Sequence, residues 1–262
     1  MKFSTTLLCS SITMAIASGS VLAESKFSLG FGLASKTNIY EKPDDDNKTL
    51  PLPVINYQSD LIYVKGLEAG LYLQPLDILK LTGFVNVQAA AYEEDDADSL
   101  DGLDDREYTA NVGIGATVFL KIGDADFGEV ALKAMTEAGD EHEGEEVDLR
   151  YGKTIMFSEQ KFHIKPYFGM TFISEDKAAY NYGVTQEQAA DAALVGNDIA
   201  TAYRPGDSVN TFVGIEGGYS INEKHTIIGS MESLQLDDYI ADSTIVKEDT
   251  ITTVSVAWLY NF

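Results

Sequence analysis

Apolar and polar side chains alternate along much of this chain with a period of two residues. Because successive side chains of a strand point to opposite faces, such alternation predicts strands with one apolar face. The clearest case is the C-terminal segment 250–262, where every second residue counted back from the end is apolar or aromatic: Phe262, Tyr260, Trp258, Val256 and Val254. A strand that exposes aromatic residues on one face is typical of a protein whose solvent is lipid.

The same alternation predicts further strands, most of them about ten residues or longer, which is the length that a tilted strand needs to cross a bilayer. These segments are 27–33, 79–92, 107–120, 129–134, 147–157, 162–172 and 209–219. Segment 225–236 is also strand-like, although its two faces are hard to distinguish. The chain is therefore expected to be all-β.

The connections between these segments alternate between short and long. Short turns are predicted at 74–77, 123–126, 158–160 and 221–224, and long polar connections at 37–49, 93–105, 137–146, 174–207 and 237–249. A transmembrane up-and-down antiparallel β-barrel has this arrangement, with short periplasmic turns and long external loops. A soluble β-sandwich, the alternative, has no reason to sort its loops by length.

Tyrosines near the ends of the proposed strands are expected to form the aromatic girdles of the barrel. They are Tyr57, Tyr63, Tyr72, Tyr92, Tyr108, Tyr151, Tyr167, Tyr219 and Tyr260. The number of strands is harder to predict, because segment 50–73 is interrupted by Pro51, Pro53, Gly66 and Gly70. One long bulged strand there gives ten strands, which we favour. A different division of that segment, or an added strand at 243–247, gives twelve.

The first residues predict a secretory signal peptide over residues 1–23, followed by a barrel domain over residues 24–262. Lys2 supplies the positive start, 7–17 is the apolar core, and small residues precede the cleavage point. Cys9 is the only cysteine, so the mature protein has no disulfide or thiol chemistry. The expected location is the outer membrane of a Gram-negative cell.

The net charge of −24 argues against a nucleic-acid partner, since phosphate binding needs a basic surface. The loop 93–105 is densely acidic, but its spacing fails the EF-hand pattern. We interpret it as a solvated external loop, with loose Ca²⁺ or Mg²⁺ binding at the lipopolysaccharide surface as the alternative. His142, His163 and His225 lack the spacing of a zinc site, and no G-x-S-x-G motif occurs. No catalytic residue, metal site or cofactor is predicted.

Charges of both signs fall on the face predicted to line the lumen. They are Lys80, Glu107, Glu129, Lys133, Asp148, Arg150, Lys165 and Glu216. Because an unpaired buried charge is costly, these groups are expected to pair across a narrow lumen and fill it. The alternative is a wetter lumen with solvated charges.

The chain resembles the MipA/OmpV family of outer-membrane proteins over nearly its whole mature length. The motifs that carry the resemblance are Pro51-x-Pro53 with Tyr57, the stretch 100–106, the stretch 182–185 followed by Gln188-Ala189, Tyr203 with Pro205, Leu236 with Asp242-Ser243 and Ile245-Val246, and the terminal 260–262. One departure is Thr244, where the family tends to have proline, and the acidic loops are longer than usual.

The resemblance implies a non-enzymatic scaffold that links a lytic transglycosylase to a penicillin-binding synthase. The family has no defined catalytic residues. Short periplasmic turns give such a scaffold little surface, so two alternatives stay open: a narrow channel for small solutes, and a surface-exposed adhesion barrel.

The terminal aromatics Trp258, Tyr260 and Phe262 resemble the assembly signal that the barrel-assembly machinery reads in outer-membrane proteins. The other expected partners are outer-membrane lipid and lipopolysaccharide, and the protein is expected to be a monomer.

Overall fold

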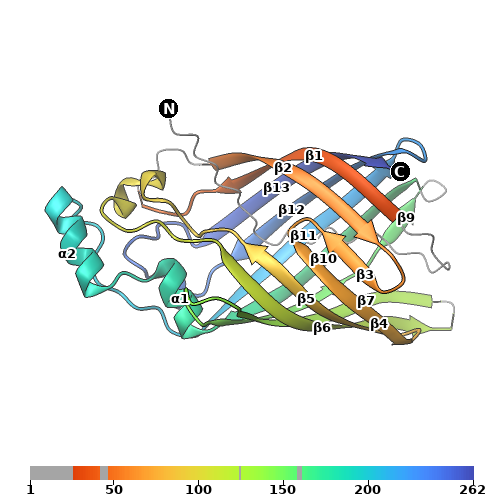
Figure 1. Ribbon diagram of the computed structural model, residues 1–262, viewed down its shortest axis with the longest axis horizontal. Coiled ribbons are helices and arrows are strands. Elements are labelled where there is room, and N and C mark those ends of the chain that lie inside the picture. Colours follow the sequence, from red (N-terminus) through yellow and green to blue (C-terminus); the bar gives the residue numbers. More distant parts are fainter. Residues whose placement is uncertain (1–25, 42–46, 124, 158–160) are drawn as a thin grey trace.

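The computed structural model describes residues 26–41, 47–123, 125–157 and 161–262. The signal peptide predicted over residues 1–23 lies outside them. Thirteen strand segments form one sheet (Figure 1): β1 (Lys26–Thr37), β2 (Asn47–Gln58), β3 (Ile62–Lys65), β4 (Glu68–Leu76), β5 (Leu79–Gln88), β6 (Thr109–Ile122), β7 (Ala125–Glu137), β8 (Glu145–Gly152), β9 (Ile155–Phe157), β10 (Phe162–Ile173), β11 (Ser208–Ser220), β12 (His225–Gln235) and β13 (Thr250–Asn261). Both β8 and β9 pair with β10, so they form one interrupted strand, and the wall has twelve strands.

The sheet closes on itself into an antiparallel barrel. β10 pairs with β11, and β1 pairs with β13 in a register that places Leu29 opposite Tyr260. The contact between β1 and β13 is close because β1 turns glycines toward the lumen: a Cβ on Gly30 would lie 2.6 Å from Leu259 Cδ2. The predicted all-β up-and-down barrel is confirmed.

The preferred count of ten strands is wrong, and the alternative of twelve is correct. Segment 50–73 does not form one bulged strand. It contains the end of β2, the four residues of β3 and the first part of β4, separated by turns at 59–61 and 66–67. Gly66 has a φ of 57°, a left-handed conformation that glycine adopts without steric cost. Sequence alternation missed the turn because β3 is too short to show a period.

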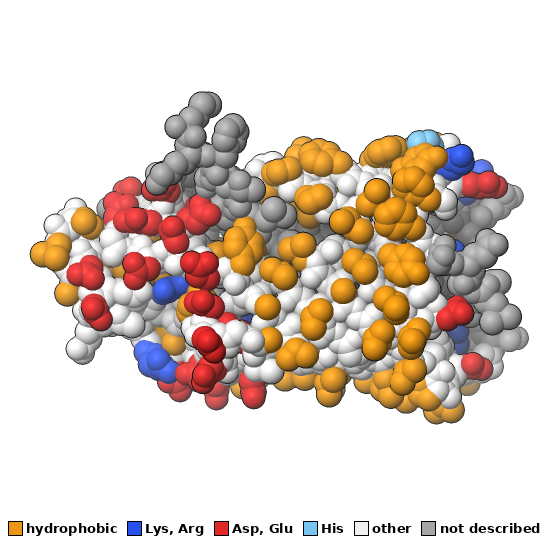
Figure 2. Space-filling view, in the orientation of Figure 1, with side chains coloured by type: hydrophobic (Ala, Val, Ile, Leu, Met, Phe, Trp, Pro, Cys, Tyr) orange, Lys and Arg blue, Asp and Glu red, His pale blue; other side chains and the backbone are white. Residues whose placement is uncertain are grey.

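Each strand turns its apolar side chains outward. On β6, Val112 and Ile114 are exposed, whereas Asn111, the residue before Val112, points to the opposite face and is buried. Figure 2 shows apolar side chains over the visible face of the barrel wall and acidic side chains gathered toward the end that carries the helices. An apolar outer band with a polar interior is the arrangement required in a bilayer.

The described loops are sorted by end as predicted, whereas the short turn predicted at 158–160 lies outside the described residues. Beyond the external end lie η1 (Glu94–Asp96), η2 (Asp98–Leu100), α1 (Glu175–Tyr182), α2 (Gln186–Val195) and α3 (Asp238–Ala241). Among the described residues, no helix is long and apolar enough to span a membrane. The girdle prediction is partly wrong: Tyr108 and Tyr219 are exposed, but Tyr63 and Tyr167 are buried inside the barrel and Tyr92 is buried among the external loops.

The β3–β4 hairpin leaves the wall incomplete near the external end. β3 pairs with β2 only over residues 56–58, and the last contact on that side is the hydrogen bond from Gly66 N to Ile55 O, at 2.9 Å. In Figure 1 the hairpin ends short of the barrel end that carries the helices. Residues 47–54 of β2 therefore pair with β1, but no strand of the described residues pairs with them on their other side.

Replacing the lipid-facing Ile114 by arginine is expected to lower the free energy of unfolding by about 2–4 kcal/mol, because the side chain meets the hydrocarbon core. Ile114 is 70 % exposed in the barrel wall. Ile122, which is 76 % exposed at the end of β6, is the matched control, and Ile122→Arg is expected to cost about 0–1 kcal/mol at the interface. Denaturant unfolding in lipid vesicles measures both, and equal costs would contradict the assigned depth.

Candidate functional site

Ion pairs between side chains of β4, β7, β10 and β11 cross the lumen. Lys165 Nζ lies 2.7 Å from Glu129 Oε1 and 3.6 Å from Glu216 Oε1. Lys133 Nζ lies 2.7 Å from Glu68 Oε2. These pairs join neighbouring and distant strands, and they confirm the prediction that lumen charges pair.

Two aromatic rings and one arginine form a cluster in the lumen beside these pairs. The Arg150 guanidinium lies 4.5 Å from the ring centroid of Tyr167 and 4.8 Å from that of Phe212. It is also 3.7 Å from Glu232 Oε2, which accepts a hydrogen bond of 3.0 Å from the Tyr167 hydroxyl. Asp148 lies at the edge of the same cluster, 4.0 Å from Arg150.

Two of the eight predicted lumen charges differ from expectation. Lys80 faces the lumen, but among the described residues its amino group lies over the Tyr72 ring, 5.9 Å from the centroid, rather than against a carboxylate. Glu107 lies in the loop before β6, and its backbone N–H donates to the Tyr180 hydroxyl. The predicted strand 107–120 begins two residues before β6. The aromatic Tyr108 fits the alternating pattern, although it lies in the loop before the strand.

The external loops fold over the barrel mouth into a compact layer, here called the cap, formed by residues 38–41, 89–108, 174–207 and 236–249. Its buried core combines side chains from all four segments: Ile39, Tyr40, Tyr92, Leu100, Leu103, Ala178, Val184, Ile240 and Ile245. The interpretation of 93–105 as a solvated loop is therefore incomplete, because its apolar residues close a core and Asp96 is buried, while most of its other carboxylates are exposed.

Carboxylates in the acidic loop act as local hydrogen-bond acceptors. Asp96 accepts from Glu93 N at 3.0 Å, and Glu94 accepts from Gly102 N at 2.8 Å. Asp96 also forms an ion pair with Lys48 of β2. Among the described residues, no group of three or more His, Cys, Asp and Glu side chains could hold a metal ion.

One lysine fastens the cap to the barrel. Lys177 of α1 is buried, and its Nζ donates to Gln88 Oε1 and Glu146 Oε2, both at 2.7 Å. These acceptors stand at the external ends of β5 and β8. Burial, together with the Glu146 carboxylate, raises the pKa of nearby Tyr182 to about 12, so this layer of the cap holds neutral phenols.

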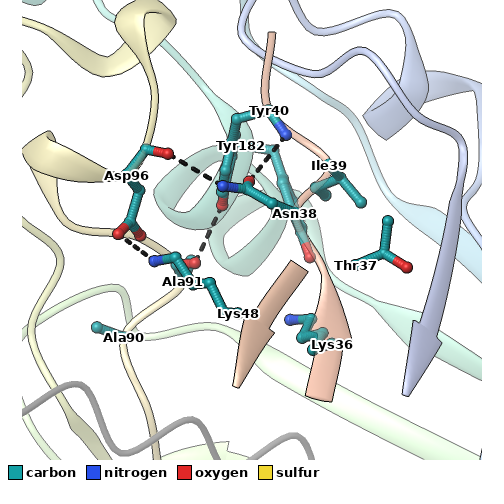
Figure 3. A pocket seen from close by; sticks show the side chains of 10 residues that line it. All are labelled: Lys36, Thr37, Asn38, Ile39, Tyr40, Lys48, Ala90, Ala91, Asp96 and Tyr182. Atoms are coloured by element: carbon teal, nitrogen blue, oxygen red, sulfur yellow. Dashed lines mark hydrogen bonds and ion pairs between the residues drawn. The ribbon is translucent and has the colours of Figure 1, made fainter. Parts of the chain in front are cut away.

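A small pocket lies where the cap meets β1 and β2 (Figure 3). Its volume is about 40 Å³, and its lining residues are Lys36, Thr37, Asn38, Ile39, Tyr40, Lys48, Ala90, Ala91, Asp96 and Tyr182. A water molecule needs about 10–15 Å³ by this measure, so the pocket has room for a few waters or a small ion. Asn38 Nδ2 donates to Asp96 O at 3.0 Å, and the Tyr40 hydroxyl donates to Ala91 O at 3.1 Å. These bonds fix the pocket walls.

His142 lies in the loop after β7. Its Nδ1 accepts a hydrogen bond of 2.8 Å from Gly144 N and lies 3.4 Å from Glu137 Oε2. Burial lowers the pKa of His142 below its usual range, and the Glu137 carboxylate offsets only part of this effect. The neutral imidazole is the form that can accept from Gly144.

The terminal aromatic residues lie together on the outer face at the periplasmic end. The Tyr260 and Phe262 ring centroids are 4.9 Å apart, and Phe262 lies 5.3 Å from Phe27 of β1. Trp258 stacks on His225 at 5.5 Å. Phe262 N donates to Phe27 O at 3.0 Å, so the last residue continues the closing contact between β13 and β1.

An apolar outer face, a charged interior and a closed ring of tilted strands together define an outer-membrane β-barrel. The family model described as MltA-interacting protein MipA matches residues 29–262. The chain belongs to this family, and it is a protein of the outer membrane.

Relatives match almost the full chain at low identity. The MltA-interacting protein of Escherichia coli strain K12 is 26 % identical over 258 residues, which is 98 % of either chain. The putative outer membrane protein YiaT of the same strain is 22 % identical and covers 90 % of this chain and 92 % of its own length. The outer membrane protein OmpV of Vibrio cholerae is 25 % identical over 79 % of this chain and 74 % of its own length.

Among solved structures, the COG4313 outer membrane channel of Pseudomonas putida F1 aligns with a TM-score of 0.46 at 9 % identity, over 93 % of this chain and 97 % of that one. The anion-selective porin of Comamonas acidovorans aligns with a TM-score of 0.42 at 7 % identity, over 91 % of this chain and 99 % of the porin chain.

We propose that Phe262 is read during assembly, and its deletion is expected to give a split result. Its ring is 74 % exposed, so the finished barrel loses less than the roughly 1.5–3 kcal/mol of a fully buried side chain. Refolding into detergent micelles should be near normal, whereas outer-membrane levels in cells should fall severalfold. Phe262→Tyr keeps an aromatic end and is the control. Normal membrane levels of the deletion variant would contradict the proposal.

Acidification is expected to loosen the loop 138–144. A histidine whose pKa is lowered by folding contributes stability above the unfolded value of about 6.5, and this stability is lost as the pH falls below it. Protonation removes the acceptor for Gly144 N–H, a bond worth about 1 kcal/mol. Hydrogen exchange at Gly144, corrected for its intrinsic pH dependence, should then become about fivefold less protected.

The control for this effect is His142→Asn, whose side-chain oxygen can accept the same bond without titrating between pH 5 and 8. Equal pH dependence of Gly144 protection in the two proteins would exclude His142 as its cause.

Proposed function

We propose that this protein is a non-enzymatic, non-conducting barrel that acts by binding another protein at its periplasmic rim. The observation that carries the proposal is the set of ion pairs and ring contacts that crosses the lumen. Ion pairs around Lys133 and Lys165 and the Arg150 cluster occupy the bore, and the folded cap lies over its external mouth. A barrel closed in two places offers surfaces rather than a passage.

The family supports a partner on the periplasmic side. The Escherichia coli relative that matches 98 % of this chain is named for interaction with MltA. By resemblance, the partner here is a periplasmic lytic transglycosylase, and a penicillin-binding synthase is the second enzyme of the scaffold. Nothing in this role requires a catalytic residue in the barrel itself.

The periplasmic rim carries apolar side chains in its turns. Leu61, Ile78 and Ile221 are each close to half exposed, and Ile122 is 76 % exposed. They lie in or beside the turns after β2, β4, β11 and β6. Exposed apolar side chains grouped at one end of a molecule mark an interaction surface, and they compensate for the shortness of the turns.

The proposal is tested by binding between the refolded barrel in nanodiscs and the periplasmic lytic transglycosylase of the same cell. The double variant Ile78→Asp/Ile221→Asp is expected to weaken binding about tenfold or more, because interface positions that matter cost over 1 kcal/mol each when altered. Surface plasmon resonance measures the dissociation constants.

The matched control alters two exposed apolar residues at the opposite end, Leu194→Asp/Val195→Asp on α2, which should leave binding unchanged. If only this control variant lost binding, the binding surface would lie on the cap, and the alternative of a surface-exposed adhesion barrel would be favoured. Absence of binding by the unaltered protein, together with a large and steady conductance in planar bilayers, would overturn the proposal in favour of a channel.

A further inference from the structure

The interruption in the barrel wall has a defined position and edge. One side of the interruption is formed by residues 47–54 of β2, which among the described strands pair only with β1. Its base is the tip of the β3–β4 hairpin, where Leu67 O accepts from Val87 N of β5 at 3.1 Å. The strand pairing of β5 with β4 continues up to Asn86, so the unpaired edge belongs to β2 alone.

Two prolines keep this edge from pairing. Alternate residues of a strand direct their backbone groups to the same side, and Ile55 O faces the hairpin because it accepts from Gly66 N. Pro51 and Pro53 share that orientation, so each places a nitrogen without a hydrogen at the open edge. Proline is confined to edge strands for this reason, and the sequence therefore specifies the interruption.

The small pocket of Figure 3 spans this interruption. Lys48 lies on β2, whereas Ala90 and Ala91 follow the end of β5, and all three line the pocket. The pocket is at the external end of the barrel, where the headgroups of the outer leaflet lie. Among the described residues, no strand of the wall lies between the membrane side and the two alanines at this level.

The charges in the pocket favour an anion. Lys36 and Lys48 both line it, and Asp96 is the one carboxylate among its lining residues. Asp96 pairs with Lys48, whereas the amino group of Lys36 forms no hydrogen bond or ion pair with any other described residue. An ammonium carries three donors, so Lys48 also keeps donors after binding Asp96. This net positive site stands out in a chain of charge −24.

We propose that this pocket binds the phosphate group of an outer-leaflet lipid, which enters from the membrane through the open edge of β2. A phosphate accepts from both ammonium groups, and a volume of about 40 Å³ admits the headgroup phosphate but not an acyl chain. The acyl chains stay outside against the apolar wall, where Pro51, Pro53 and Ile55 face the lipid. This site is independent of the periplasmic rim.

The test uses the refolded protein with phosphatidic acid, whose phosphate is a monoester, and with inorganic phosphate as the free form of the same group. Native mass spectrometry measures lipid binding, and ³¹P NMR titration measures inorganic phosphate. Lys36→Gln is expected to weaken phosphatidic acid binding about tenfold or more, since it removes a charge-assisted hydrogen bond. Inorganic phosphate should bind more weakly than the lipid, because it gains no apolar contact with the wall.

Two variants control for charge and folding. Lys247→Gln removes an exposed lysine of the cap and should bind like the unaltered protein. Lys36→Arg keeps the charge and should retain binding, which separates loss of the anion contact from a loss of structure. Near-UV circular dichroism confirms that each variant is folded.

Equal phosphatidic acid binding by Lys36→Gln and the unaltered protein would overturn the site. Inorganic phosphate that binds as tightly as the lipid would overturn entry from the membrane. Lys48→Gln gives a second test of the pocket, and it too must weaken binding for the proposal to stand.

Discussion

The structure depends on the pairing of its first strand with its last. In hydrocarbon no water is present to satisfy backbone N–H and C=O groups, so a spanning sheet must close. β1 and β13 close it over nine paired residues, from Ser28 opposite Asn261 to Lys36 opposite Thr253. Gly30 and Gly32 allow this approach, since a Cβ on Gly32 would lie 2.5 Å from Ala257 Cβ. The aromatic end of the chain thus belongs to the closure itself.

Closure also determines what the interior must contain. Strand geometry sends every second side chain inward, and in this chain many of those side chains are charged. An unpaired buried charge is costly, and two inward-facing lysines have carboxylate partners: Lys165 pairs with Glu129 and Glu216, and Lys133 pairs with Glu68. Lys80 lies over the Tyr72 ring instead. Lys177 forms a similar ion pair at the mouth with Glu146. Ion pairs therefore join strands across the lumen and also join the cap to the barrel.

Alternation in the sequence predicted the strands, their faces and the pairing of lumen charges, because these follow from the strand period alone. It could not place Tyr63 or Tyr167, since a tyrosine fits both a girdle and a lumen wall, and only the register decides. It also missed the core of the cap, because Leu100, Leu103 and Ile240 come from loops with no period. The pocket combines β1, β2 and three loops, and no local pattern marks a site assembled from such distant segments.

The unpaired edge of β2 is an exception to the rule that closes the rest of the wall. It can be tolerated near the external end, where headgroups and water supply the hydrogen bonds that hydrocarbon cannot. Pro51 and Pro53 further reduce the number of backbone donors that need a hydrogen-bond partner, since neither has an N–H on the open side. The β3–β4 hairpin then restores full pairing below, from Asn56 downward. The hairpin tip thus ends at the depth that polar solvent can reach, which places this opening where lipid phosphates lie.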